Sequence, residues 1–329
     1  MAVCVHVRGA RAVLAGNTRQ SGRRMSEVTE LTAEPEAIPE VHHSVTSDLV
    51  ALTKPRIISL LLVTTVAAMY VAGTPSGWLV LTVLVGGYLM AGGAHALNMY
   101  LDQDIDAHMP RTKLRPIPSG RMAPRAVLAF GVLLATAATF ILARFANVLT
   151  AALALIGFYG YVFLYTRWLK RKTPQNIVIG GAAGAIPPLV GYAAVSGSLD
   201  LTAWTLFLII FYWTPPHFWA LALLKKRDYG AAGVPMAPLI WGERHTQDQM
   251  LWYLGIMVAL SILPFCIGSF GLFYLVSAIV VAAPFAYGVI KLRLGSGDAT
   301  STARFVFMYS LLYLALLYVA MVIDLHVFR

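Results

Sequence analysis

Long apolar runs without charge, separated by short basic segments, dominate the chain from about residue 50 onward. A run of roughly 20 apolar residues is long enough to cross a bilayer as a helix. The 249–290 run is too long for one helix, and Gly268 and Gly271 mark its break. We therefore predict an all-α, polytopic membrane protein with about nine transmembrane helices, near 57–73, 78–99, 126–143, 145–166, 176–196, 201–224, 249–268, 271–290 and 305–324.

Composition and charge agree with this class. Hydrophobic residues make up 58% of the chain and charged residues 12%, and the formal net charge is +10. If the N-terminus is inside, the loops on that side hold 18 of the 25 Lys and Arg, and the N-terminal tail holds five more. This asymmetry follows the positive-inside rule. The basic charge therefore indicates a cytoplasmic N-terminus and does not indicate a nucleic-acid partner.

Residues 1–48 differ from the predicted membrane domain, residues 49–329. Positions 1–26 contain five arginines and no acidic residue, whereas 27–48 are acidic. An Arg-rich, acid-free start is typical of a transit peptide, and an upstream extension of the reading frame with Met25 as the true start explains it equally well. We expect a disordered tail outside the fold. The location is then a bacterial inner membrane or, alternatively, the mitochondrial inner membrane.

A polar motif, Asn98-x-x-x-Asp102-x-x-x-Asp106, follows the second predicted helix. Residues four apart share one face of a helix, so these three side chains project together, while Asp104 points elsewhere. Two carboxylates and an amide oxygen suit Mg²⁺, which completes its shell with water and phosphate oxygens. The alternative interpretation is a solvated loop after a transmembrane helix. The register of the motif favours metal binding by Asn98, Asp102 and Asp106.

Two arginines, four residues apart, follow this motif. Planar guanidinium groups can each donate two parallel hydrogen bonds to diphosphate oxygens. The sequence therefore predicts a metal–diphosphate site at the membrane surface. The predicted catalytic residues are Asp102, Asp106, Arg111 and Arg115.

A weaker polar cluster begins in the sixth predicted helix, at Trp213-Thr-Pro-Pro-His217-Phe-Trp219. The two prolines distort a helix and free carbonyl groups, so we expect this span to line a cavity. An ionisable residue within a span is a functional candidate, and the alternative for His217 is a hydrogen-bonded packing histidine. Asp228 follows among cations, where it either binds a second Mg²⁺ or pairs with Lys225. We favour the metal and include Asp228 in the predicted metal-binding set.

The loop after the fourth predicted helix is also basic. Such loops usually contact anionic lipid, but one or two of the side chains can reach a diphosphate. We select two cations of this loop as substrate-binding residues, in addition to the candidates above. The predicted substrate-binding set is Asn98, Lys170, Arg171, His217 and Asp228.

These motifs resemble those of the UbiA-type intramembrane prenyltransferases. The superfamily pattern comprises Asn98-x-x-x-Asp102-x-x-x-Asp106, Arg111-Thr-x-x-Arg115-Pro and Pro118-Ser-Gly-Arg121. From about Leu52 to the C-terminus the chain further resembles the protohaem IX farnesyltransferase (haem O synthase) family, through Thr53-Lys-Pro-Arg56, Trp213-Thr-Pro-Pro-His-Phe-Trp219 and Asp228-Tyr-x-x-Ala-Gly-Val-Pro-Met236. One departure is that Asp228 stands alone where superfamily members often have Asp-x-x-x-Asp.

The resemblance implies a helical bundle whose central cavity takes farnesyl diphosphate and haem b, with Mg²⁺ as cofactor. It implies that the farnesyl C–O bond ionises and that a haem vinyl group attacks the allylic cation. Water then completes the hydroxyethylfarnesyl side chain of haem O, the precursor used in haem–copper oxidase assembly. His217 is the expected haem-binding residue, and a haem A synthase is a possible partner.

Two other functions fit the same sequence. Another UbiA-type enzyme prenylates a quinone precursor, and a polytopic transporter also combines intramembrane charges with broken helices. The position of the charges argues against transport, because they cluster at helix ends and the mid-membrane zone has essentially only histidines.

Overall fold

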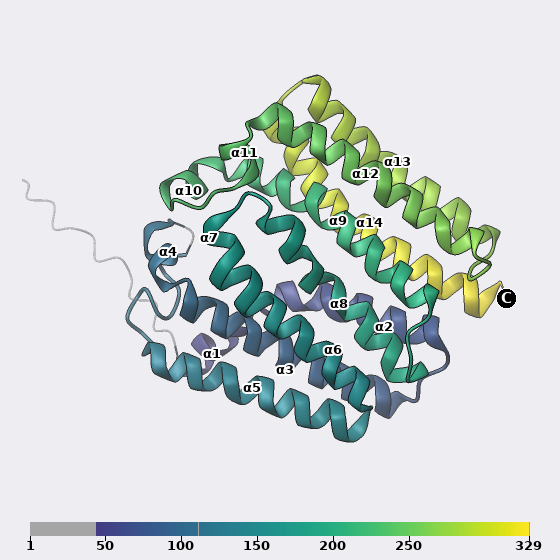
Figure 1. Ribbon diagram of the computed structural model, residues 1–329, viewed down its shortest axis with the longest axis horizontal. Helices are drawn as coiled ribbons and strands as arrows, with labels where there is room; N and C mark the ends of the chain where they lie inside the picture. Colours follow the sequence, from purple (N-terminus) through teal and green to yellow (C-terminus); the bar gives the residue numbers. More distant parts are fainter. Residues whose placement is uncertain (1–43, 111, 329) are drawn as a thin grey trace, which may run out of the picture. The chain divides into compact units, whose positions relative to one another are not determined.

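The computed structural model describes residues 44–110 and 112–328, and the structural statements below concern this part of the chain. Within it the fold is all-helical, and nine helices are long and apolar enough to cross a membrane, as predicted (Figure 1). They are α2 (Pro55–Ala72), α3 (Gly77–Leu101), α5 (Pro124–Phe145), the continuous segment Val148–Lys172, α8 (Asn176–Ser196), α9 (Leu201–Leu224), α12 (Glu243–Cys266), α13 (Leu272–Leu294) and α14 (Ala299–Val327). The break predicted in the 249–290 run falls between α12 and α13.

The structure also has five short helices among the described residues. They are α1 (Val45–Thr53), which precedes the first span, α7 (Lys170–Lys172), which ends the fourth span, and α4 (Gln103–His108), α10 (Lys226–Ala231) and α11 (Ala237–Ile240), which lie between spans. Figure 1 shows α4, α7, α10 and α11 together at one end of the bundle, on the left, with the C-terminus at the opposite end. The three polar clusters selected from the sequence therefore lie at or near one end, called the site end below. Of the predicted disordered tail, residues 1–48, the part up to His43 lies outside the described residues. The prediction is wrong for residues 45–48, which form the start of α1.

Glycines allow close packing around α3 and α8. A Cβ atom on Gly131 of α5 would lie 1.9 Å from Leu97 Cδ1 of α3, and one on Gly191 of α8 would lie 2.0 Å from Thr65 O of α2. Small residues of this kind let helix backbones approach each other within a membrane, where close contact stabilises the bundle. The Gly131 contact brings α5 close to α3, which leads into the Asn98 motif.

Two features of the spans were not predicted from the sequence. The fourth span begins as α6 (Val148–Tyr159) and continues as a π-helix, η1 (Gly160–Leu169), before α7. The sixth span, α9, is continuous through Pro215 and Pro216, where we expected distortion. Thr214 Oγ1, beside the prolines, donates to Ile210 O at 2.8 Å. In α8 and α9, 61% of the most apolar window is buried within the protein, so α9 is an inner helix.

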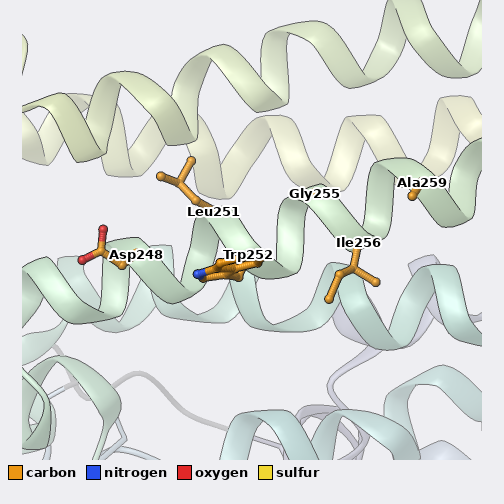
Figure 2. Close-up of a pocket in the computed structure, with 6 residues that line it drawn as sticks. All are labelled: Asp248, Leu251, Trp252, Gly255, Ile256 and Ala259. Carbon is orange, nitrogen blue, oxygen red and sulfur yellow. The ribbon is translucent and has the colours of Figure 1, made fainter.

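A groove of about 640 Å³ lies on α12 (Figure 2). It is mostly apolar, and its lining residues are Asp248, Leu251, Trp252, Gly255, Ile256 and Ala259. Trp252 is largely exposed. None of the predicted site residues that the structure describes is among those lining this groove, so the candidate site has to be built from the polar contacts at the site end.

Candidate active site

The three predicted metal ligands lie together at the junction of α3 and α4. Asp102 and Asp106 are only 1% and 2% exposed, and Asn98 is also buried. Although α3 ends before Asp102, the backbone N–H groups of Asp102 and Asp106 donate to the carbonyls four residues earlier, at 2.9 and 2.8 Å. The four-residue spacing is therefore kept across the junction. The side chain of Asp104 is 59% exposed and lies off the shared face, as the spacing predicts.

A basic side chain contacts each buried carboxylate. Lys170 Nζ donates to Asp102 Oδ2 at 2.5 Å, and Arg115 Nη1 donates to Asp106 Oδ2 at 2.5 Å. Both cations come from other segments of the chain, α7 and the loop after α4. Burying a carboxylate without a partner is strongly destabilising, so these two ion pairs offset the cost of burying Asp102 and Asp106.

Arg171 joins the buried and exposed parts of the acidic motif. It donates to both carboxylate oxygens of Asp104, at 2.6 and 2.8 Å, and its Nη2 lies 3.6 Å from Asp102 Oδ1. The hydrogen bonds from Arg171 lower the pKa of Asp104 to about 2. Asp104 thus has a structural partner in Arg171. Arg111 lies outside the described residues, and its pairing with Arg115 on a diphosphate stays a prediction.

Lys54 is a site residue to which the sequence analysis gave no role. It lies between α1 and α2 in a left-handed backbone conformation, with φ 54° and ψ 60°, and its Nζ donates to Asn98 Oδ1 at 3.0 Å. Burial, followed by the charges of Arg115 and Lys170, lowers the pKa of Lys54 to about 7. The available signal was its position in Thr53-Lys-Pro-Arg56, at the start of the first span.

The π-helix η1 forms another wall of the site. Asn98 Nδ2 donates to Asp102 Oδ2 at 2.7 Å and to Thr166 Oγ1 at 3.2 Å, and the Thr166 hydroxyl donates to Tyr161 O at 2.9 Å. The last of these bonds spans five residues, which is the period of a π-helix. Since Lys170 directly follows η1, the same segment orients the Asn98 amide and delivers the cation to Asp102. π-Helical segments are frequent at functional sites.

The donor set fits a hard divalent cation. Asp102 Oδ1 is buried and has no hydrogen-bond partner in the described part of the chain. Among residues 44–110 and 112–328, no group of three or more His, Cys, Asp or Glu side chains could hold a metal ion by itself. A cation at this position would therefore bind two carboxylates, with the Asn98 amide oxygen nearby, and take its remaining oxygens from substrate and water. Mg²⁺ is commonly bound in this way, through one or two carboxylates and substrate phosphates.

His217 lies in a different environment. Its ring is buried between Trp213 of α9, with a centroid distance of 4.3 Å, and Phe307 of α14, at 4.7 Å. Its Nδ1 lies 2.6 Å from Ser310 Oγ, and the Ser310 hydroxyl donates to Phe307 O at 2.7 Å. These contacts describe the stacked, hydrogen-bonded histidine of the alternative interpretation, and haem binding by His217 stays a prediction.

Asp228 is partly exposed, at 28% for its side chain, and lies 3.7 Å from Lys225 Nζ. This is the ion pair considered as an alternative to metal binding. A role for Asp228 as a ligand of a second Mg²⁺ stays a prediction.

These features define a multi-pass helical membrane protein with a buried acidic motif surrounded by cations at one end. The sequence model of the UbiA prenyltransferase family matches residues 60–311 of this chain. The chain belongs to this family.

Curated relatives extend the comparison. A protoheme IX farnesyltransferase of Roseiflexus castenholzii is 54% identical over 287 residues, which cover 87% of this chain and 53% of the relative. The chain thus spans about half the length of that relative. A protoheme IX farnesyltransferase of a Picosynechococcus species is 51% identical over 276 residues, which cover 83% of this chain and 87% of the relative.

Solved structures share the fold. A digeranylgeranylglyceryl phosphate synthase superposes with a TM-score of 0.70 at 19% identity, covering 85% of this chain and 98% of the other. A UbiA homologue from Archaeoglobus fulgidus, bound to DMAPP and Mg²⁺, superposes with a TM-score of 0.62 at 14% identity, covering 84% and 99%. At these identities the similarity establishes the arrangement of helices.

Proposed function

We propose that this chain is a Mg²⁺-dependent protohaem IX farnesyltransferase, which transfers the farnesyl group of farnesyl diphosphate to a vinyl group of haem b and yields haem O. The observation that carries the proposal is the buried pair Asp102 and Asp106, each contacted by a cation from another segment. Relatives that are 54% and 51% identical to this chain are named protoheme IX farnesyltransferase. These names support farnesyl diphosphate as the prenyl donor and haem b as the acceptor.

The acidic motif and its cations account for the diphosphate. Asp102 and Asp106, with Asn98, would hold Mg²⁺, which supplies neutralising charge to the diphosphate when bound. Lys170 and Arg115 contact the two carboxylates and can also donate to phosphate oxygens. Negative charge grows on the leaving diphosphate as the farnesyl C–O bond ionises, so these donors stabilise the transition state more than the bound substrate.

The surrounding helices would keep bulk water from the allylic cation. The site end of α3 is packed against α5 through glycine contacts, and Thr166 and His95 on the neighbouring walls are buried. Exclusion of water prevents premature capture of a reactive intermediate. In the proposed reaction water enters the chemistry only after the vinyl carbon has formed its bond to the farnesyl group.

His217 is the proposed contact to the haem acceptor. His217 Nδ1 and the Ser310 hydroxyl are hydrogen-bonded, and we propose that Nδ1–H is the donor, because the hydroxyl also lies within hydrogen-bond distance of Phe307 O. In that tautomer Nε2 carries a lone pair, which is the form of neutral imidazole that ligates a metal. A hydrogen bond from the other ring nitrogen is the usual way in which proteins orient a ligating histidine.

We propose that the protein is a multi-pass protein of a bacterial inner membrane with its site end in the cytoplasm. The distribution of Lys and Arg supports this orientation. Single cysteines at Lys113 and at Ser76, in a background without Cys4 and Cys266, test it with an impermeant thiol reagent. We expect labelling of the Ser76 position from outside intact cells, and labelling of the Lys113 position only after the membrane is opened. Haem A synthase stays a predicted partner.

A reconstitution assay tests the activity. The purified full chain, with Mg²⁺, labelled farnesyl diphosphate and haem b, should convert haem b to haem O, and chelation of Mg²⁺ should stop the conversion. Prenylation of an aromatic acid without haem O formation would instead favour a quinone-type prenyltransferase. Movement of either substrate across a vesicle membrane without any transfer would favour a transporter.

A further inference from the structure

An ion pair joins α1 to the loop that carries Arg115. Asp48 of α1 is only 3% exposed, and Arg121 donates to both of its carboxylate oxygens, from Nε at 3.0 and 3.1 Å and from Nη2 at 2.9 Å. The two residues are 73 positions apart in the sequence. A two-pronged guanidinium–carboxylate contact fixes orientation as well as distance. The proposed chemistry uses neither residue.

Arg121 also holds the loop. Its Nη2 donates to Leu114 O at 3.1 Å, directly before Arg115. On the other side, the hydroxyl of Ser119 donates to Arg115 O at 2.7 Å. Arg115 in turn donates to Asp106. A chain of polar contacts therefore runs from α1, through the loop, to one of the two buried carboxylates of the site.

Apolar packing follows the same path. A small hydrophobic cluster, separate from the main core, joins α1 to α3, to the loop and to α5. Its buried members are Leu52, Ala96, Met99, Ile117 and Val127. Every one of them is at most 8% exposed. The loop is thus held to α1 by an ion pair at one point and by apolar contacts at another.

The other end of α1 reaches the site as well. Lys54 follows its last residue and donates to Asn98 Oδ1 at 3.0 Å. α1 therefore contacts the acidic motif directly through Lys54 and indirectly through the ion pair and Arg115. α1 lies before residues 60–311, the part of the chain that matches the sequence model of the family.

We propose that Asp48 and Arg121 are positioning residues, and that α1 is a brace which holds the 112–122 loop so that Arg115 reaches the substrate diphosphate. Burial of a carboxylate is costly unless it is paired and hydrogen-bonded, and here the pairing fixes a loop whose arginine enters the site. The role of the brace in binding rests on the proposed function, because its ligand is the diphosphate. Its role in holding the loop does not.

Hydrogen exchange of the full chain in lipid nanodiscs tests the structural part. Asp48→Asn keeps the size of the side chain and removes its charge, and we expect exchange in 112–122 to accelerate about tenfold, as the loss of a charged hydrogen bond implies. Asp48→Glu retains the carboxylate and should stay close to wild type. Arg121→Lys, which loses the fork, gives a second and milder disruption if Asp48→Asn does not fold.

The matched control is Glu243→Gln. It removes the ion pair between Glu243 and Lys226, which is 2.8 Å long and lies at the same end of the bundle, but which is much more exposed than the Asp48–Arg121 pair. We expect no change in exchange at 112–122 in this variant. Unchanged exchange in Asp48→Asn, or equal acceleration in Asp48→Asn and Asp48→Glu, would overturn the brace.

Binding of a non-hydrolysable farnesyl diphosphate analogue, with Mg²⁺ and without haem, tests the functional part. Asp48→Asn should weaken this affinity about tenfold, and Asp48→Glu and Glu243→Gln should leave it unchanged. Faster loop exchange with wild-type affinity would overturn the positioning role. If the wild-type chain itself does not bind the analogue, the proposed function is contradicted, and the exchange experiment still decides whether α1 holds the loop.

Discussion

The acidic motif of α3 and α4 and the histidine cluster of α9 are both polar regions within an apolar bundle, but they satisfy their polar groups in opposite ways. The partners of Asp102 and Asp106 are cations, Lys170 and Arg115, that reach them from other segments. His217 is stacked between aromatic rings and bonded to a neutral hydroxyl. Buried charges are costly and neutral packing is not, so the first region points to chemistry more strongly than the second.

The largest effect should follow loss of a carboxylate in the acidic motif. Asp102→Ala and Asp106→Ala should each lower the proposed farnesyl transfer by about a thousandfold or more, because each would remove a proposed metal ligand and the partner of a cation proposed to contact the diphosphate. Single-turnover assays with labelled farnesyl diphosphate measure this. Asp104→Ala is the control, since Asp104 is exposed and should cost far less. Equal losses at all three positions would show that the shared face has no special role.

Substitutions in the histidine cluster should change binding of the haem acceptor and leave binding of the prenyl donor unchanged. His217→Ala should weaken haem affinity, and Ser310→Ala should do so less, by about tenfold, as is common for residues that orient a ligand. Both variants should bind the farnesyl diphosphate analogue as wild type does. Haem titration by absorbance, beside analogue binding, separates the two effects. Wild-type haem affinity and haem O production in His217→Ala would make the residue a packing histidine.

Lys54 should make stability depend on pH. Its pKa is about 7 in the folded protein against 10.5 for the ordinary side chain, so the unfolded chain binds more protons between these values, and this term of stability rises with pH. The Lys54→Met variant should therefore exceed wild type in stability most below pH 7, and this difference in stability should disappear above about pH 10.5. The difference in thermal unfolding temperature between the two proteins, measured across this range, gives the result.

The smallest effect is expected at Asp228. Because the side chain is partly exposed and pairs with Lys225, Asp228→Asn should cost no more than about 1 kcal/mol, roughly a fivefold loss of activity. Turnover measured over a range of Mg²⁺ concentrations is the appropriate assay. A loss as large as that of Asp102→Ala, with a changed Mg²⁺ dependence, would instead place a second metal at Asp228. The polar cluster around α9 and α10 would then also contain a metal site, as is proposed for the acidic motif.

Local patterns in the sequence predicted much of the structure. Each span depends on a run of apolar residues, and the break between α12 and α13 depends on nearby glycines. The face shared by Asn98, Asp102 and Asp106 depends on a spacing of four residues, which survives even though the helix changes at Asp102. In all of these cases the residues that decide the outcome are close together in the chain.

Other features depend on partners far away in the sequence. Lys54 meets Asn98 across 44 positions, Thr166 meets Asn98 across 68, and Asp48 meets Arg121 across 73. Such contacts arise only when helices pack, and no single segment encodes them. Asp48 was assigned to the N-terminal tail because 27–48 are acidic, whereas the structure places it in α1. Pro215 and Pro216 were expected to distort α9, but the helix is continuous and its inner position is set by its neighbours.

The π-helix η1 has a consequence for insertions and deletions in this protein. A π turn contains about one residue more than an α turn, so the fourth span includes extra chain beside the Asn98 amide. Because η1 is 10 residues long, about two π turns, deletion of one residue beside Thr166 would convert one of these turns into an ordinary α turn and leave the flanking helices in register. Thr166 would then lose its bond to Tyr161 O and with it the position from which it meets Asn98. In η1, the number of residues therefore sets the position of Thr166 beside Asn98, in addition to the identity of the side chains.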